Sequence, residues 1–253
     1  MKSCIKWVGG KSKSVSKILP LFPKHKKYVE VFGGAGWLLF SKEPSDIEVF
    51  NDFDSNLMNF CQAVKEKPME LIDSFDWMLV SREIFNQYKE IYKEGIYKDE
   101  IHQAHIFYYL VQSGFGADMK YPSFGTGRDR NRLRIENIEK DVLGATERLK
   151  EVELINLSFE KVIEMYDSED TFFFIDSPYR NTKGYAVGKF VDKQYELLYE
   201  LCKNAKGKWL YTINDDDFIR ELFKDFNIIT NEVPYSISNA KRKRTEELII
   251  TNF

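Results

Sequence analysis

One segment near the N-terminus constrains the fold more than any other part of the chain. Residues 28–32 (YVEVF) predict a short strand, and the small residues 33–36 (GGAG) follow it directly. Residues 37–40 open a helix, and residues 47–50 predict a second strand. A strand, a tight turn, a helix and another strand make a βαβ unit, in which the two strands lie parallel in one sheet.

The second half of the chain continues the alternation of strands and helices. Further helices are predicted at 135–150, 195–202 and 218–223, and further strands at 153–157, 171–175, 209–213, 228–236 and 248–252. The strand at 171–175 (TFFFI) is apolar throughout, as the centre of a parallel sheet requires. The last two strands flank a basic run, so a hairpin with a basic tip is the simplest arrangement.

The intervening part has a different character. Residues 55–112 are predicted to be mostly helical, and 113–134 form an irregular loop that is too rich in glycine for a helix. We therefore expect an α/β sheet domain built from residues 1–59 and 139–253, interrupted by a mostly helical insert at 60–138.

Composition is that of an ordinary globular protein. The 253 residues are 43% hydrophobic and 30% charged, and no apolar run approaches the roughly 20 residues that span a membrane. The N-terminus lacks the apolar stretch of a secretory signal. Cys4, Cys61 and Cys202 lie far apart and predict reduced thiols in a cytoplasmic protein, with neither a zinc site nor a disulfide framework.

Basic residues are clustered although the formal net charge is -3. Six lysines crowd residues 11–27, and two further clusters are Arg128, Arg130, Arg132 and Arg134, and Lys241, Arg242, Lys243 and Arg244. Taken alone, each cluster is better explained by a solvated face. For three clusters in an acidic chain, contacts with nucleic acid, chiefly with its phosphates, explain the pattern as well as solvated faces do.

The glycine turn predicts a ligand that contains adenosine. Small residues at 33–36 let a ligand approach the backbone, and Asp52 follows Gly33 at the distance where an acid commonly accepts hydrogen bonds from a ribose. A tight turn capped by an acid is the alternative. The spacing differs from the GxGxxG pattern of dinucleotide dehydrogenases.

The sharpest motif is Asp176-Ser177-Pro178-Tyr179, directly after the most apolar strand. That position lies at the edge where open α/β sheets bind ligands. An amino group on an aromatic ring is a poor nucleophile, and a carboxylate with a neighbouring carbonyl can accept its hydrogen bonds. Asp176 supplies the carboxylate, Ser177 the carbonyl, and Tyr179 a ring on which an extruded base stacks. A strand-ending Asx turn is the alternative.

Four segments, in this order, resemble motifs of the Dam-type N6-adenine DNA methyltransferases. They are residues 6–11 (KWVGGK), 29–36 (VEVFGGAG), 51–57 (NDFDSNL) and 176–179 (DSPY). Softer matches are Leu157-Ser158-Phe159 and the pair 235–239 and 246–248. The resemblance covers nearly the whole chain and leaves the insert as the part that matches least.

The resemblance implies a Rossmann-like methyltransferase sheet whose insert recognises the target sequence in double-stranded DNA. It implies S-adenosylmethionine as the methyl donor, direct transfer to a flipped adenine, and a protein that is monomeric in solution. The residues implied to contact the donor are Trp7, Lys11, Phe32, Gly33, Gly34, Ala35, Gly36, Asp52, Phe159 and Asp176. Catalysis is assigned to Asp176, Ser177, Pro178 and Tyr179.

Two departures from the family pattern leave alternatives open. Ser177 replaces the usual first proline, and Ser158 stands where many members carry Asp. A methyltransferase that acts on cytosine N4 or on RNA is one alternative, although Asp176 favours adenine over cytosine. A DNA-binding module that keeps the fold and has lost turnover is the other.

Overall fold

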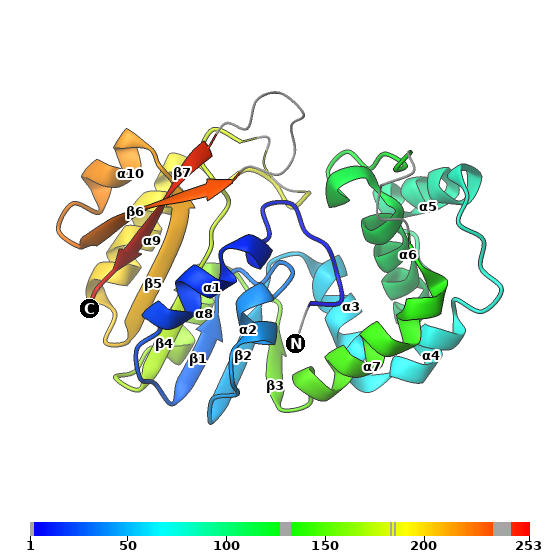
Figure 1. Cartoon of the computed structure of the whole chain (residues 1–253), viewed down its shortest axis with the longest axis horizontal. Coiled ribbons are helices and arrows are strands. Elements are labelled where there is room, and N and C mark those ends of the chain that lie inside the picture. Colours follow the sequence, from blue (N-terminus) through cyan, green and yellow to red (C-terminus); the bar gives the residue numbers. More distant parts are fainter. Residues whose placement is uncertain (1–2, 127–132, 183, 185, 235–243) are drawn as a thin grey trace.

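The computed structural model describes residues 3–126, 133–182, 184, 186–234 and 244–253. Its centre is a seven-stranded sheet in the order β3-β2-β1-β4-β5-β7-β6 (Figure 1). The strands are β1 (Lys27–Glu30), β2 (Ile47–Asn51), β3 (Val152–Ile155), β4 (Thr171–Ile175), β5 (Lys208–Asn214), β6 (Asn227–Pro234) and β7 (Arg244–Thr251). The predicted Rossmann-like α/β sheet is thereby confirmed.

The five strands from β3 to β5 are parallel, and β7 is antiparallel to both β5 and β6. At the sheet centre, Val29 of β1 lies between Val49 of β2 and Phe173 of β4. All five residues of β4 are buried, which explains why its sequence is apolar without alternation. The predicted hairpin is present as the paired strands β6 and β7, and its tip at 235–243 lies outside the described residues.

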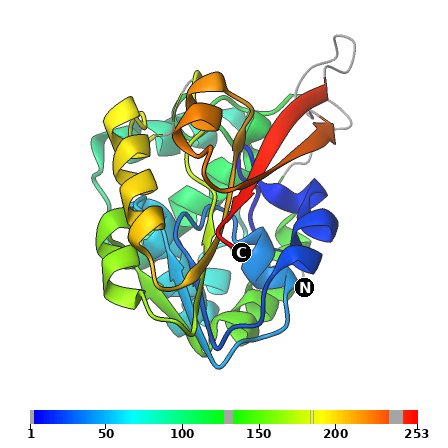
Figure 2. The same ribbon diagram turned by 90° about the vertical axis from the view of Figure 1, so that its left-hand side faces the viewer.

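Helices cover both faces of the sheet (Figure 2). They are α1 (Val15–Ile18), α2 (Trp37–Ser41), α3 (Ser55–Glu66), α4 (Pro68–Asp73), α5 (Arg82–Glu94), α6 (Glu100–Ser113), α7 (Ile138–Leu149), α8 (Phe159–Tyr166), α9 (Asp192–Asn204) and α10 (Asp217–Leu222). Alternate residues of β4 enter opposite cores: Phe172 and Phe174 face one, and Phe173 and Ile175 face the other, with α8, α9 and α10.

The helices from α4 to α6 lie beyond the β3 edge of the sheet (Figure 1). Phe60 of α3 stacks on Tyr108 of α6 with ring centroids 5.4 Å apart, and both belong to the core that reaches the sheet. Polar caps fit the helix starts, since Asp99 accepts a hydrogen bond from the backbone of His102 at the start of α6. The division of the chain at residues 60 and 138 stays a prediction.

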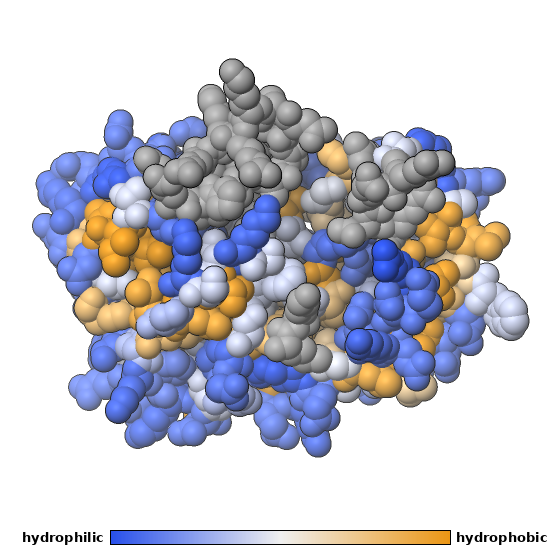
Figure 3. All heavy atoms as spheres, in the orientation of Figure 1, coloured by the Kyte–Doolittle hydropathy of each residue, from blue (hydrophilic) through white to orange (hydrophobic). Residues whose placement is uncertain are grey.

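The two sides of the sheet at which the parallel strands begin and end differ in character. The carboxyl ends of the parallel strands point to the upper side of Figure 1, where the glycine turn and the loop after β4 lie. Hydrophilic side chains cover the lower side of the molecule (Figure 3). The three cysteines are free and buried. Across the described ranges, no helix has both the length and the apolar character that a membrane crossing needs.

Candidate active site

The glycine turn and Asp52 are joined directly. The Asp52 carboxylate accepts hydrogen bonds from the backbone N–H of Gly34 and from that of Asp54, both at 2.8 Å. Gly34 has a φ of +50°, and a Cβ there would lie 2.9 Å from the Trp7 ring, so only glycine fits. The sequence had predicted that Trp7, Gly34 and Asp52 serve one ligand, and they meet at one place.

Asn51 holds three strand ends together and was not among the predicted site residues. Its side-chain amide donates to the carbonyl of Val31 at 2.8 Å, and its oxygen accepts from the backbone of Leu157 at 2.9 Å. It thereby links the chain after β1, β2 and β3. The only signal for this role in the sequence is an asparagine at the end of a predicted strand. That signal does not identify its hydrogen-bond partners.

Three aromatic rings form a cluster beside the glycine turn. Phe32 stacks against Phe159 with centroids 5.7 Å apart, and Phe190 packs edge-on against Phe32 at 5.8 Å. Phe32 and Phe159 are both among the residues predicted to contact the donor, and they are neighbours. Phe190 was missed because it lies between motifs, in a segment with no regular structure.

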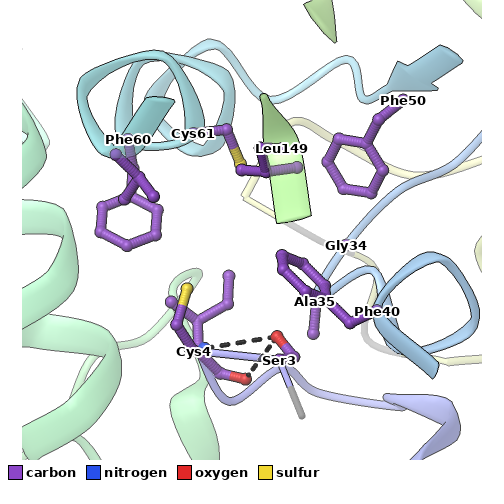
Figure 4. Close-up of a pocket in the computed structure, with 11 residues that line it drawn as sticks. Ser3, Cys4, Gly34, Ala35, Phe40, Phe50, Phe60, Cys61 and Leu149 are labelled. Carbon is purple, nitrogen blue, oxygen red and sulfur yellow. Dashed lines mark hydrogen bonds between the residues drawn. The ribbon is translucent and has the colours of Figure 1, made fainter. Parts of the chain in front are cut away.

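A small cavity lies next to the turn, lined by Ala35, Phe50 and Cys61 among others (Figure 4). Its volume is about 10 Å³, the room of a single water molecule. A Cβ on Gly33 would come within 2.4 Å of the Phe50 ring. The cavity is therefore a packing gap between the turn and the core, and not a place for a donor molecule.

The Asp176–Tyr179 turn is held through each of its first three residues. The hydroxyl of Thr212 on β5 donates to Asp176 at 2.9 Å. The hydroxyls of Ser177 and Tyr211 are bonded to each other at 2.8 Å, and the Tyr195 hydroxyl donates to the carbonyl of Pro178 at 2.7 Å. These partners come from β5 and α9 and fix the direction in which the turn points.

Lys11 and Glu247 complete the site from opposite ends of the chain. The Lys11 ammonium lies 2.6 Å from Asp176 and 2.8 Å from Glu247, and it also bonds the Tyr179 hydroxyl. Tyr179 in turn donates to Glu247. Lys11 is only 5% exposed. Three residues to which the sequence assigned roles thus meet at one point, together with Glu247, which lies in the softer match at 246–248 and was assigned no role.

Burial and charge shift the pKa values of these groups. Burial raises the pKa of Asp176, opposed by the charge of Lys11 and reinforced by that of Glu247. Burial by itself lowers the pKa of Lys11, but the two carboxylates outweigh it and the pKa is raised. Burial raises the pKa of Asp52 to about 6. Two carboxylates and one ammonium, when ionised, leave a net negative charge beside Tyr179.

The side chains of the residues predicted to contact nucleic acid lie outside the described structure. Arg128, Arg130, Arg132, Lys241, Arg242 and Lys243 lie outside the described residues, and of Arg244 only the backbone in β7 is described. The lysines of 11–27 do not form one basic face. Lys11 is buried in the site, whereas Lys26 pairs with Asp170 at the opposite edge of the sheet, 3.1 Å away. Spacing along the sequence does not show such a separation.

Comparison with known proteins agrees with the geometry. A family model for D12 class N6 adenine-specific DNA methyltransferases matches residues 7–237. The Type II methyltransferase M.CviBI of Paramecium bursaria Chlorella virus NC1A is 27% identical, with both chains covered completely. The Type II methyltransferase M.MjaIII of Methanocaldococcus jannaschii is 26% identical over 100% of this chain and 99% of its own.

A third relative is named as the methylase of a retron. The Retron Ec67 DNA adenine methylase of Escherichia coli is 25% identical over 98% of this chain and 90% of its own. The family match covers the glycine turn, Asp52 and the Asp176–Tyr179 turn. The chain therefore belongs to the D12 class N6 adenine-specific DNA methyltransferases.

Proposed function

We propose that this chain transfers a methyl group from S-adenosylmethionine to the N6 amino group of an adenine extruded from double-stranded DNA, and that it acts as a monomer. The observation that carries the assignment is the position of Asp176. Its carboxylate lies at the carboxyl end of the central strand, next to Tyr179, and is 19% exposed. It is therefore held firmly and still open to a substrate.

The residues around the glycine turn fit the donor. Asp52 uses two hydrogen bonds for the backbone, and a carboxylate has further lone pairs that can accept from ribose hydroxyls. The ring cluster of Phe32, Phe159 and Phe190 offers apolar faces to an adenine. Trp7 and Gly34 form the wall beside it. When bound, the donor supplies a methyl group on a positively charged sulfur.

The residues of the Asp176–Tyr179 turn act on the base. Asp176 accepts a hydrogen bond from the amino group, draws its nitrogen towards tetrahedral geometry, and stabilises the positive charge that grows there. The carbonyl of Ser177 accepts the second hydrogen. The Tyr179 ring stacks on the base and offsets the few kcal/mol that extrusion costs. Positioning and electrostatics carry the reaction, and the proton leaves after transfer, so no strong base is needed.

The helical segment at 60–138 and the β6–β7 hairpin are the proposed DNA contacts. Because β7 is antiparallel to β5, the chain enters β7 at the active-site edge of the sheet. The basic residues 241–244 directly precede and begin that strand. Phosphate contacts from this hairpin, and sequence recognition by the helical segment, are consistent with that arrangement.

The test of this assignment is Asp176→Ala. Removing the carboxylate is expected to lower methyl transfer from labelled donor to DNA by roughly 100-fold or more, as for other lost electrostatic contacts to a reacting group. Donor binding by calorimetry stays close to wild type, since Asp52 and the ring cluster are unchanged. Transfer at the wild-type rate would refute the role of Asp176. Donor binding by the wild type with no transfer to any DNA would favour a binding module instead.

A further inference from the structure

Glu247 is a buried carboxylate of the described site, and the function proposed above does not involve it. It lies on β7 opposite Asn214 of β5, and its side chain is 7% exposed. One oxygen, Oε1, accepts from the Lys11 ammonium at 2.8 Å and from the Tyr179 hydroxyl. The same atom therefore fixes two residues at the place of chemistry.

The surroundings of the other oxygen of Glu247 help to separate the role of its charge from the role of its hydrogen bonds. Oε2 is buried and has no hydrogen-bond partner within the described part of the chain. A glutamine oxygen in the position of Oε1 would accept the same two hydrogen bonds. What glutamate adds is a negative charge, and burying that charge is costly unless a cation pairs with it.

The charges around Asp176 indicate how the Glu247 carboxylate affects the site. The Lys11 ammonium lies 2.6 Å from the Asp176 carboxylate. An ammonium that paired with Asp176 alone would cancel the negative charge that has to face the target amino group. Glu247 shares Lys11, so that the three groups together keep one negative charge when ionised.

We propose that Glu247 is a positioning residue that acts as the counter-ion of Lys11, leaves the charge of Asp176 available to the amino nitrogen, and holds the Tyr179 ring for base stacking. The proposal rests on the function proposed above. It gives a part in the reaction to β7, which is antiparallel to its two neighbours in the sheet. The four motif segments predicted from the sequence all lie outside this strand. No proton or bond of Glu247 itself changes in the reaction.

The charge of Glu247 affects how activity depends on pH. The ionisable groups that interact with Asp176 are Lys11 from the N-terminal segment, Glu247 from β7, Glu30 from β1 and Tyr211 from β5. Tyr179, from the same turn as Asp176, shares the Lys11 ammonium with it. The charge of Glu247 raises the pKa of Asp176. Replacing Glu247 by glutamine is therefore expected to lower that pKa, and to move the acid limb of kcat/KM to lower pH. A purely structural role would leave the limb in place.

The experiment compares Glu247→Gln, Glu247→Asp and a matched control, Glu48→Gln. Glu48 is buried like Glu247 and pairs with Lys42 and Arg148, but it lies near the start of β2, away from the active-site edge. Rates are measured with labelled S-adenosylmethionine and DNA from a methylase-deficient source. Glu247→Gln is expected to lower kcat roughly 10–100-fold, the effect of a lost charge-assisted contact.

The other variants separate charge from shape. Glu247→Asp keeps the charge and is expected to retain more activity than Glu247→Gln, and Glu48→Gln is expected to lower Tm with kcat and the acid limb unchanged. Wild-type turnover of Glu247→Gln, a loss with the acid limb in its wild-type position, or better activity of Gln than of Asp would each overturn the proposal. An inactive wild type, or an Asp176→Ala variant with full activity, would instead contradict the function proposed above.

Discussion

The two aspartates of the site differ in what surrounds them. Asp52 accepts from two backbone N–H groups, whereas Asp176 is held by the Lys11 ammonium and by a hydroxyl on β5. Backbone donors cannot swing away, so Asp52 is suited to a fixed contact with a ribose. The partners of Asp176 are side chains, and they leave the carboxylate free to exchange one contact for a substrate amino group.

Ser177 shows how a departure from the family pattern is accommodated. Proline would stiffen the turn by fixing φ. Here the Ser177 hydroxyl bonds the Tyr211 hydroxyl, and both residues are at most 1% exposed. A buried hydrogen bond to the neighbouring strand thus ties down the position that lacks the ring. The serine is compatible with an ordered catalytic turn.

That interpretation predicts coupling between Ser177 and Tyr211. Ser177→Ala and Tyr211→Phe each leave one buried hydroxyl without this partner, and each is expected to cost about 1–3 kcal/mol in the free energy of unfolding. The double variant is expected to cost less than the sum of the two. Urea unfolding of the three variants measures the coupling. Strictly additive costs would show that the bond does not tie the turn to β5.

At the scale of elements, Glu30 connects β1 to α2. Its carboxyl accepts from the Tyr28 hydroxyl at 2.8 Å and from the backbone of Leu39 at 3.0 Å. Burial raises the pKa of Glu30 to about 8. The group is therefore protonated in the folded protein at neutral pH, and ionised in the unfolded chain above its ordinary value.

The sign of the pH effect follows from this difference. Since the folded state binds the proton more tightly, the contribution of Glu30 is fully present below its ordinary pKa of 4.5 and is lost as pH rises to about 8. The stability difference between wild type and Glu30→Gln is expected to fall by about 1.4 kcal/mol per pH unit in that window.

Denaturant unfolding from below pH 4.5 to about pH 8 measures the slopes for both glutamates. Glu48 provides the opposite case, because its hydrogen bonds and ion pairs with Arg148 and Lys42 outweigh burial and lower its pKa. Its contribution is present above pH 4.5 and is lost as pH falls through the lower folded value. A slope of the same sign for Glu30→Gln and Glu48→Gln would contradict the assigned protonation of Glu30.

At the scale of the whole molecule, local patterns predicted the sheet well. The apolar run of β4 and the glycine turn after β1 are dictated by burial and by backbone sterics, both of which act over a few residues. Asp52 and Asp176 each follow a predicted strand, so the sequence placed both of them at strand ends. Predicted helix and strand limits differ from the observed ones by a few residues, because tertiary packing decides where an element ends.

The parts that sequence reasoning missed depend on long-range register. Glu247 lies 236 positions from Lys11 along the chain, and Thr212 meets Asp176 only because β5 pairs with β4 in one register. Tyr211 reaches the site in the same way, whereas Phe190 reaches it from a segment without regular structure. No periodicity or motif contains that information. The residues predicted to bind DNA stay predictions, since their side chains lie outside the described structure.

The central claim is methyl transfer to the amino group of adenine, and the chemical identity of the product tests it most directly. Unmethylated DNA is incubated with the wild-type protein and isotopically labelled S-adenosylmethionine, digested to nucleosides and analysed by mass spectrometry, with RNA as a parallel substrate and Asp176→Ala as the control. Labelled N6-methyladenine is expected in DNA treated with the wild type, and none in DNA treated with the variant. N4-methylcytosine as the only product, or label found only in RNA, would contradict it.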